Sequence, residues 1–131
     1  MTDAPLGTAE EQLARARKAL RAAEALAALS LFEDAISRAY YATFHGACAL
    51  AAHVGLDVRT HDGLRALVYE HFIKTGALER KFGRLLARSA TDRNDADYNV
   101  KVDFDGADAD AAARDARDFL ETVAKLVGRD E

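Results

Sequence analysis

One apolar run, from about Ser37 to about Gly55, constrains the fold more than any other part of the chain. Alanine and aromatic side chains fill it so evenly that a helix formed there must be buried on most of its circumference. The run nevertheless carries Arg38 and His45, which are costly to bury without partners. Several other helices must therefore surround this one.

Composition narrows the class of protein further. The chain has 131 residues, enough for one domain that buries about two thirds of its unfolded surface. The high alanine content, the single proline and the 31% of charged residues are typical of a soluble helical protein. A net charge of −4 argues against a protein held to nucleic acid mainly by bulk positive potential.

The expected location is the cytoplasm. Cys48 is the only cysteine, so no internal disulfide can form, and a reducing compartment fits. No apolar stretch reaches the roughly 20 residues that span a bilayer, and no signal peptide is recognisable at the start of the chain. We therefore expect no contact with a membrane.

Capping signals and apolar spacing predict five helices. A capping box at Thr8–Glu11 opens the first, which ends near Ala28, and a second at Ser30–Glu33 opens the long apolar helix, which ends before Gly55. The remaining helices are predicted over about 61–74, over about 79–97, and from a cap at Asp105 to about 127.

These elements predict an all-α fold, an antiparallel bundle of four to five helices. We expect one domain over 8–127, with a flexible tail at 1–7 and a short tail at 128–131. Only Val100–Phe104 shows a weak alternation typical of a strand.

Arg93 is the first candidate functional residue. Helical spacing places it on the same side of its helix as Phe82, Leu86 and Ser89, so it extends an apolar stripe. Asp97, one turn later, could form an ion pair with it. The alternative is a guanidinium directed into a cleft or a dimer interface, where it would bind a phosphate.

Arg38 and His45 form a second candidate pair. They are seven residues apart and share one face of the long helix, where Ala42 and Ala49 leave space around them. They could define a polar groove, or be core residues whose hydrogen bonds come from adjoining helices. The adjacent tyrosines 40 and 41 point to different sides and are interpreted as packing residues.

Four histidines raise the question of a metal, and their spacing argues against one. The shortest interval is eight residues, whereas a helical metal pair needs three or four, and Cys48 has no Cys-x-x-Cys partner. We therefore expect no metal and no other cofactor. His61 differs from the others because it begins a helix, where free amides attract anions, although Thr60–His61 could simply be a cap.

Basic residues are frequent in two helices: Arg15, Arg17, Lys18 and Arg21 lie in the first, and Arg80, Lys81, Arg84 and Arg88 lie in the fourth. Arg80, Arg84 and Arg88 lie along one side of the fourth helix at a spacing of four. Such a row could contact an RNA backbone, but a solvated face is the usual explanation and the one favoured here. Glycine-rich phosphate loops, nucleophile elbows and paired-carboxylate signatures do not occur.

Three separated motifs resemble the HEPN domain family (higher eukaryotes and prokaryotes nucleotide-binding). They are Ser37–His45, Thr60–Gly63 followed by His71–Gly76, and Arg93–Tyr98, and the match extends from about Thr8 to Val127. The resemblance implies a helical bundle that commonly forms a homodimer, with the two copies of the late arginine motif near each other. It also implies a small nucleotidyltransferase as partner in a toxin–antitoxin pair.

Many members of that family are metal-independent ribonucleases that use an arginine and, four to six residues later, a histidine. Arg93 matches the arginine, but Tyr98 stands where the histidine is expected. A phenol with a pKa near 10 is a poor general base at neutral pH. Tyr98 could instead orient a phosphate or be modified by a nucleotidyltransferase, and the acidic Asp92, Asp95 and Asp97 oppose binding of an unshielded phosphate backbone.

Two hypotheses follow. The first is a dimeric module that binds a nucleotide or a partner protein, with Arg38, His45, His61 and Arg93 as the phosphate- or nucleotide-binding residues. The second is a ribonuclease toxin that cleaves RNA with Arg93 and Tyr98 as the catalytic residues, helped by His45 or Arg38. A further alternative is a stable helical dimer with no ligand of its own, in which the internal arginines are only structural.

Overall fold

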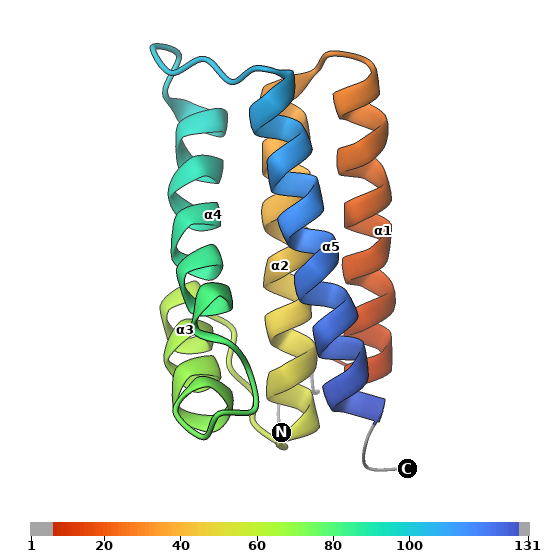
Figure 1. Ribbon diagram of the computed structural model, residues 1–131, viewed down its shortest axis with the longest axis vertical. Coiled ribbons are helices and arrows are strands. Elements are labelled where there is room, and N and C mark those ends of the chain that lie inside the picture. Colours follow the sequence, from red (N-terminus) through yellow and green to blue (C-terminus); the bar gives the residue numbers. More distant parts are fainter. Residues whose placement is uncertain (1–6, 129–131) are drawn as a thin grey trace, which may run out of the picture.

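The computed structural model describes residues 7–128, and over that range it contains five α-helices, one π-helical segment and no strand. The elements are α1 (Ala9–Ala28), α2 (Phe32–His53), α3 (His61–Val68), η1 (Tyr69–Ile73), α4 (Arg80–Tyr98) and α5 (Gly106–Gly128). The four long helices run alternately up and down, and α3 lies beside the start of α4 (Figure 1). The predicted all-α antiparallel bundle is confirmed.

Two of the predicted helix starts are confirmed. The Thr8 hydroxyl accepts a hydrogen bond from the amide of Glu11, and the Glu11 carboxylate accepts one from the amide of Thr8. At the start of α5, Asp105 and Asp108 exchange the same two kinds of bond. These reciprocal caps satisfy amides that the first turn of a helix leaves free.

The predicted capping box at Ser30–Glu33 is wrong. Ser30 has a φ of 62° and ends α1, because the amide of Leu31 donates to the carbonyl of Leu26 and that of Ser30 to the carbonyl of Ala27. This pair of bonds is the Schellman motif, in which a left-handed residue closes a helix. The residue preceding α2 is therefore Leu31, which has no side-chain cap.

α2 is the central helix, as its composition predicts. It packs against α1, α3, α4 and α5, and 13 of its residues are buried. At Gly46, α5 comes so close that an added Cβ would lie 2.7 Å from Leu120 Cδ2 and 2.9 Å from Phe119 Cε2. Burial raises the pKa of the Cys48 thiol to about 11, so this cysteine behaves as a core residue.

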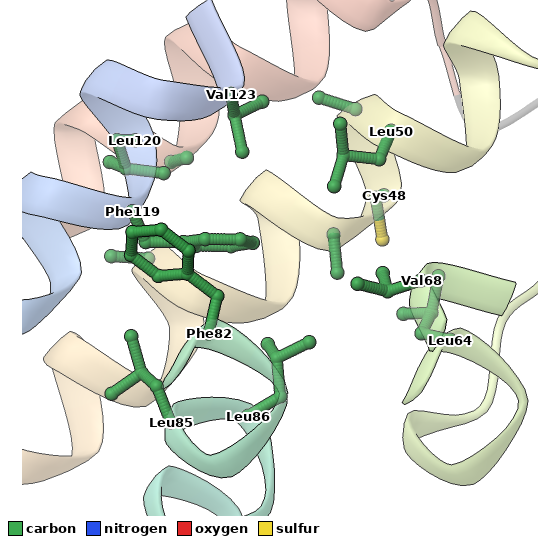
Figure 2. Packing of buried hydrophobic residues seen from close by; sticks show 14 of the residues in the cluster. Cys48, Leu50, Leu64, Val68, Phe82, Leu85, Leu86, Phe119, Leu120 and Val123 are labelled. Atoms are coloured by element: carbon green, nitrogen blue, oxygen red, sulfur yellow. The ribbon is translucent and has the colours of Figure 1, made fainter. Parts of the chain in front are cut away.

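Apolar side chains from α2, α3, α4 and α5 converge in one core (Figure 2). The rings of Phe82 and Phe119 have centroids 5.5 Å apart and join α4 to α5. The largest side chains with almost no exposure are those of Leu50, Leu64, Val68, Phe119 and Val123. This core fixes the relative positions of the helices that carry the polar residues considered below.

The helix predicted over 61–74 is not uniform. After Val68 the backbone widens into η1, where the amide of Lys74 donates to the carbonyl of Tyr69 over 2.8 Å. Gly76, with a φ of 85°, follows it. The stretch Val100–Phe104 forms turns and irregular backbone, since no neighbouring strand is available among the described residues.

The tails predicted at 1–7 and 128–131 fall mostly outside the described residues, which exclude 1–6 and 129–131. Within the described range, no helix has both the length and the apolar character needed to cross a bilayer.

Candidate functional site

Arg93 is held by side chains from two helices. Its Nη2 donates a hydrogen bond to the Tyr41 hydroxyl over 3.1 Å, and its Nε lies 2.9 Å from Asp97 Oδ2. The Nε contact is an ion pair without hydrogen-bond alignment, because the buried Nε has no hydrogen-bond partner. The predicted Arg93–Asp97 pair is confirmed. The Arg93 side chain as a whole is 28% exposed, although its Nε is buried.

Three tyrosine rings surround this guanidinium. Arg93 Cζ lies 5.4 Å from the ring centroid of Tyr40, 5.6 Å from that of Tyr41 and 5.8 Å from that of Tyr98. At such distances the ring faces attract a cation. Burial raises the pKa of Tyr40, whereas Tyr98 is 70% exposed. We call these four residues, with Asp97, the Arg93 cluster.

Arg38 joins the same cluster from outside. It is exposed, and its Cζ lies 4.5 Å from the ring centroid of Tyr41, so two guanidinium groups contact one ring. Its interpretation as a core arginine is wrong. The face of α2 that carries Arg38 also carries the partly exposed Tyr41 and His45, and this face lies at the surface.

His61 lies at the edge of the cluster. Its ring centroid is 5.8 Å from that of Tyr40, and its Nε2 is buried without a hydrogen-bond partner among the described residues. Burial, and then the nearby Arg65, lower the pKa of His61, which favours the neutral ring. The hydroxyl of Thr60 caps α3 by accepting from the amide of Gly63, so the cap predicted for this helix start is present.

His45 lies apart from the Arg93 cluster. Its Nδ1 is 2.9 Å from the Gln12 Oε1, and it borders a separate groove with Arg15 and Arg59. Burial, and then Arg15, lower the pKa of His45. The structure therefore brings Arg38, His61, Arg93 and Tyr98 around Tyr40 and Tyr41, but it places His45 about two helical turns along α2 from Arg38.

The basic row of α4 lies on an exposed face. Arg80, Arg84 and Arg88 are exposed, and Arg88 Nη2 donates to Asp115 Oδ2 of α5 over 3.0 Å. Lys81 forms a similar bridge to Asp118 over 2.9 Å. Some basic side chains on this face therefore form ion pairs within the molecule.

Tyr40 and Tyr41 are the residues that sequence reasoning undervalued. Both were interpreted as packing residues, yet Tyr41 is the hydrogen-bond partner of Arg93 and both rings face its guanidinium. One signal was available, because Arg38 and Tyr41 are three residues apart and must be neighbours on a helix. The long-range contact with Arg93, 52 positions away, left no local trace.

Comparison of the sequence with known proteins identifies the family of this chain. Residues 9–126 match the family model described as the HEPN domain. A UPF0332 protein of Thermotoga maritima is 32% identical over 113 residues, which cover 86% of each chain. A protein of Methanocaldococcus jannaschii whose name is "Putative toxin MJ0605" is 32% identical over 112 residues, 86% of this chain and 83% of its own. A UPF0332 protein of Pyrococcus horikoshii is 42% identical over 60 residues, 46% of this chain and 42% of its own.

The family model spans nearly all of the described bundle, and two of these relatives cover more than four fifths of the chain. The chain therefore belongs to the HEPN domain family.

Proposed function

We propose that this protein is a nucleotide- or partner-binding module of a toxin–antitoxin type pair, acting as a homodimer beside a small nucleotidyltransferase. One observation carries the proposal: the guanidinium of Arg93 is fixed among three tyrosines, with a tyrosine where the family's ribonucleases have a histidine. Such an arrangement supplies binding groups. The name of the Methanocaldococcus jannaschii relative supports the toxin–antitoxin setting.

The chemistry of the Arg93 cluster suits a nucleotide. Arg38 and Arg93 are positively charged, so both can form ion pairs with a phosphate. The planar guanidinium group also matches the geometry of the phosphate oxygens. Exposed tyrosine rings can stack on a nucleobase. Asp97 already neutralises part of the Arg93 charge, so a ligand phosphate must compete with it or use Arg38 as well.

Tyr98 is the residue through which a nucleotidyltransferase would act. Its ring is 70% exposed at the end of α4, so a partner enzyme can reach the hydroxyl. We expect the partner to transfer AMP from ATP to this side chain: the Tyr98 hydroxyl oxygen bonds to the α-phosphorus, the α–β phosphoanhydride bond breaks, and pyrophosphate and the phenol proton leave. Intact-protein mass spectrometry would show the adduct in the wild type and in Tyr69→Phe, whose exposed ring lies in η1, and would show none in Tyr98→Phe.

The test of the function compares binding with cleavage. The purified chain is titrated with ATP by calorimetry and incubated with RNA in the presence of EDTA, as wild type, Arg93→Ala and Arg84→Ala. Arg84 is the matched control because it is an exposed arginine of the same helix. We expect the wild type and Arg84→Ala to bind ATP, Arg93→Ala to bind at least about tenfold more weakly, and none to cleave RNA.

A second function is favoured by His61. His61 has a neutral ring beside Tyr40, which suits a proton acceptor, although its Nε2 is buried and would have to become exposed to reach a substrate. In a ribonuclease toxin it would take the proton role while Arg93 stabilises charge on the scissile phosphate. Cleavage by the wild type that Arg93→Ala abolishes would replace the binding proposal with this one. ATP binding unchanged in Arg93→Ala would remove the Arg93 cluster from the nucleotide-binding function.

Dimer formation is tested separately. Light scattering after gel filtration is expected to give twice the 14.2 kDa mass of the chain. A monomer at micromolar concentration would contradict this part of the proposal while leaving the nucleotide site open to test.

A further inference from the structure

A cleft of about 230 Å³ lies between α2, α4 and α5, next to the Arg93 cluster. Its walls are apolar and include Ile36, Leu85 and Phe104, while the small side chains of Ala111 and Ala112 on α5 leave it open. Tyr40 belongs to both regions, since it lines the cleft and its ring faces Arg93. Nothing in the function proposed above uses this cleft.

The polar lining of the cleft accepts hydrogen bonds. The Thr43 hydroxyl donates to the carbonyl of Tyr40 over 2.8 Å, and the Ser89 hydroxyl donates to that of Leu86 over 3.2 Å. The two hydroxyl oxygens lie 3.2 Å from each other. Each hydroxyl has a single proton, which it donates to a backbone carbonyl. No proton is then left for the contact between the two hydroxyl oxygens, so each oxygen keeps a lone pair that can accept a hydrogen bond. A ligand that donates hydrogen bonds would satisfy them.

The charged lining of the cleft is acidic. Asp92, Asp108 and Asp115 contribute three carboxylates, and the only cation in the lining, Arg88, is paired with Asp115. Among the described residues, neither Asp92 nor Asp108 forms an ion pair, and Asp108, which is exposed, uses its Oδ2 to accept a hydrogen bond from the amide of Asp105 over 3.0 Å. Burial raises the pKa of Asp92 even though Arg88 opposes that shift. A half-buried carboxylate without a cation is an unfavourable arrangement that a bound cation would relieve.

The surroundings of the cleft carry the same sign of charge. Residues 92–118 contain nine aspartates against four arginines and lysines, a net charge of −5, whereas the whole chain has −4. This segment, which includes Asp92, Asp108 and Asp115 of the cleft lining, is therefore more negative than the chain as a whole. Such a field raises the local concentration of cations.

We propose that this cleft binds an organic cation, a protonated amine or guanidinium group carried on an apolar stem. The charged group would lie at Asp92 and Asp108, with the Thr43 and Ser89 hydroxyls as further acceptors, and the stem would pack against the apolar walls. The apolar walls disfavour a hydrated metal ion, and the acidic lining disfavours a nucleotide. The cation belongs either to a free amine or to a lysine or arginine side chain of a partner protein.

The experiment is an NMR titration of the full chain with n-butylguanidinium, followed through backbone amide shifts. The matched probe is 1-pentanol, a neutral molecule with a similar apolar stem. We expect the cation to shift the amides of Ser89, Asp92 and Ala112 at concentrations at least tenfold below those at which the alcohol does. Equal shifts with both probes, or none with the cation, would overturn the proposal.

Variants test which carboxylates are responsible. Asp92→Asn with Asp108→Asn removes two charges from the cleft, and Asp103→Asn with Asp110→Asn removes two exposed charges nearby. We expect the first pair to weaken binding at least tenfold and the second to change it less than twofold. Equal weakening by both pairs would reduce the site to general electrostatic attraction and refute it. Amide spectra of the free variants show whether each is folded. Ser89→Ala is a further variant, which removes one of the two hydroxyls of the lining and leaves the carboxylates in place.

A second arm distinguishes the source of the cation. A capped pentapeptide with a central arginine between alanines is titrated in the same way. Tighter binding of the peptide than of butylguanidinium assigns the site to a partner protein, and the reverse assigns it to a free amine. Because the probes are cations, the result is independent of ATP binding at Arg93, so failure of one proposal is distinguishable from failure of the other.

Discussion

Two neighbouring positions of α4 serve two regions of opposite charge. Arg93 lies among tyrosine rings on one side of Tyr40, whereas Asp92 lines the acidic cleft between α2, α4 and α5. Successive side chains of a helix point about 100° apart, so two adjacent residues can face different parts of the molecule. The acidic residues next to Arg93 in sequence were expected to oppose a phosphate there. Asp92 lines the cleft, whereas Asp97 pairs with Arg93, so a ligand phosphate has to compete with Asp97.

The two regions also differ in how they are built. The Arg93 cluster consists of side chains from α2 and α4 that already contact one another. The cleft needs α5 as its third wall, and there α5 contributes small alanines and the carboxylates of Asp108 and Asp115. The first region is therefore preorganised by its own contacts, and the second depends on how closely α5 packs against α2.

The largest effect is expected from Gly46→Leu. A side chain at this position must displace Leu120 and Phe119, because even a Cβ would lie within 2.9 Å of both. We expect the free energy of unfolding to fall by about 3 kcal/mol or more. Urea denaturation measures it, with Gly128→Leu as the matched control, since no atom lies within 4 Å of a Cβ at that glycine.

The same variant bears on the comparison of the two regions. Moving α5 away from α2 should weaken butylguanidinium binding to the cleft more than ATP binding to the Arg93 cluster. If Gly46→Leu were as stable as the wild type, the close contact between α2 and α5 would be wrong.

A smaller effect is expected from Tyr41→Phe. The substitution keeps the ring against Arg38 and Arg93 and removes only the hydroxyl that accepts from Arg93 Nη2. Because one hydrogen bond contributes about 0.5–1.5 kcal/mol, we expect ATP affinity to fall about three- to tenfold. Calorimetry with ATP measures this, and Tyr69→Phe, at an exposed tyrosine of η1, is the control.

Butylguanidinium affinity should not change in Tyr41→Phe. An equal loss of affinity for both ligands would show that the two regions act as one site through Tyr40.

The sequence predicted the fold well where local signals determine structure. The capping box at Thr8, the cap at Asp105 and the all-round apolar helix α2 were all visible in short stretches of residues. Ser30 was misread because serine suits the start of a helix, and only the tertiary direction of the chain made it the left-handed end of α1 instead.

The candidate site was predictable only in part. Arg93 and Asp97 are one helical turn apart, so their ion pair followed from spacing. The contact between Arg93 and Tyr41 depends on how α2 and α4 pack, which no local pattern encodes. The cleft was missed for the same reason, since its carboxylates come from two helices and its hydroxyls face each other only in the folded bundle.

The smallest predicted effect concerns the ionisation of Asp92. Burial raises the pKa of this carboxyl in the folded protein above its value in the unfolded chain, which is near 4. Between these two pKa values the folded state binds more protons than the unfolded state, so stability contributed by this group falls as the pH rises through that window. Asp92→Asn removes the penalty. The variant should therefore match the wild type below about pH 4 and be slightly more stable at neutral pH.

Urea denaturation at a series of pH values measures this difference, and Asp110→Asn, at an exposed aspartate of α5, corrects for the change in total charge. Saturating butylguanidinium should reverse the order at neutral pH, because a cation in the cleft stabilises the folded wild type and has less effect on the variant. A wild type that remained the less stable protein with the ligand present would mean that Asp92 does not contact the cation. The cleft would then be an apolar pocket whose acidic edge has no role in binding, in contrast to the Arg93 cluster, where charge and rings act together.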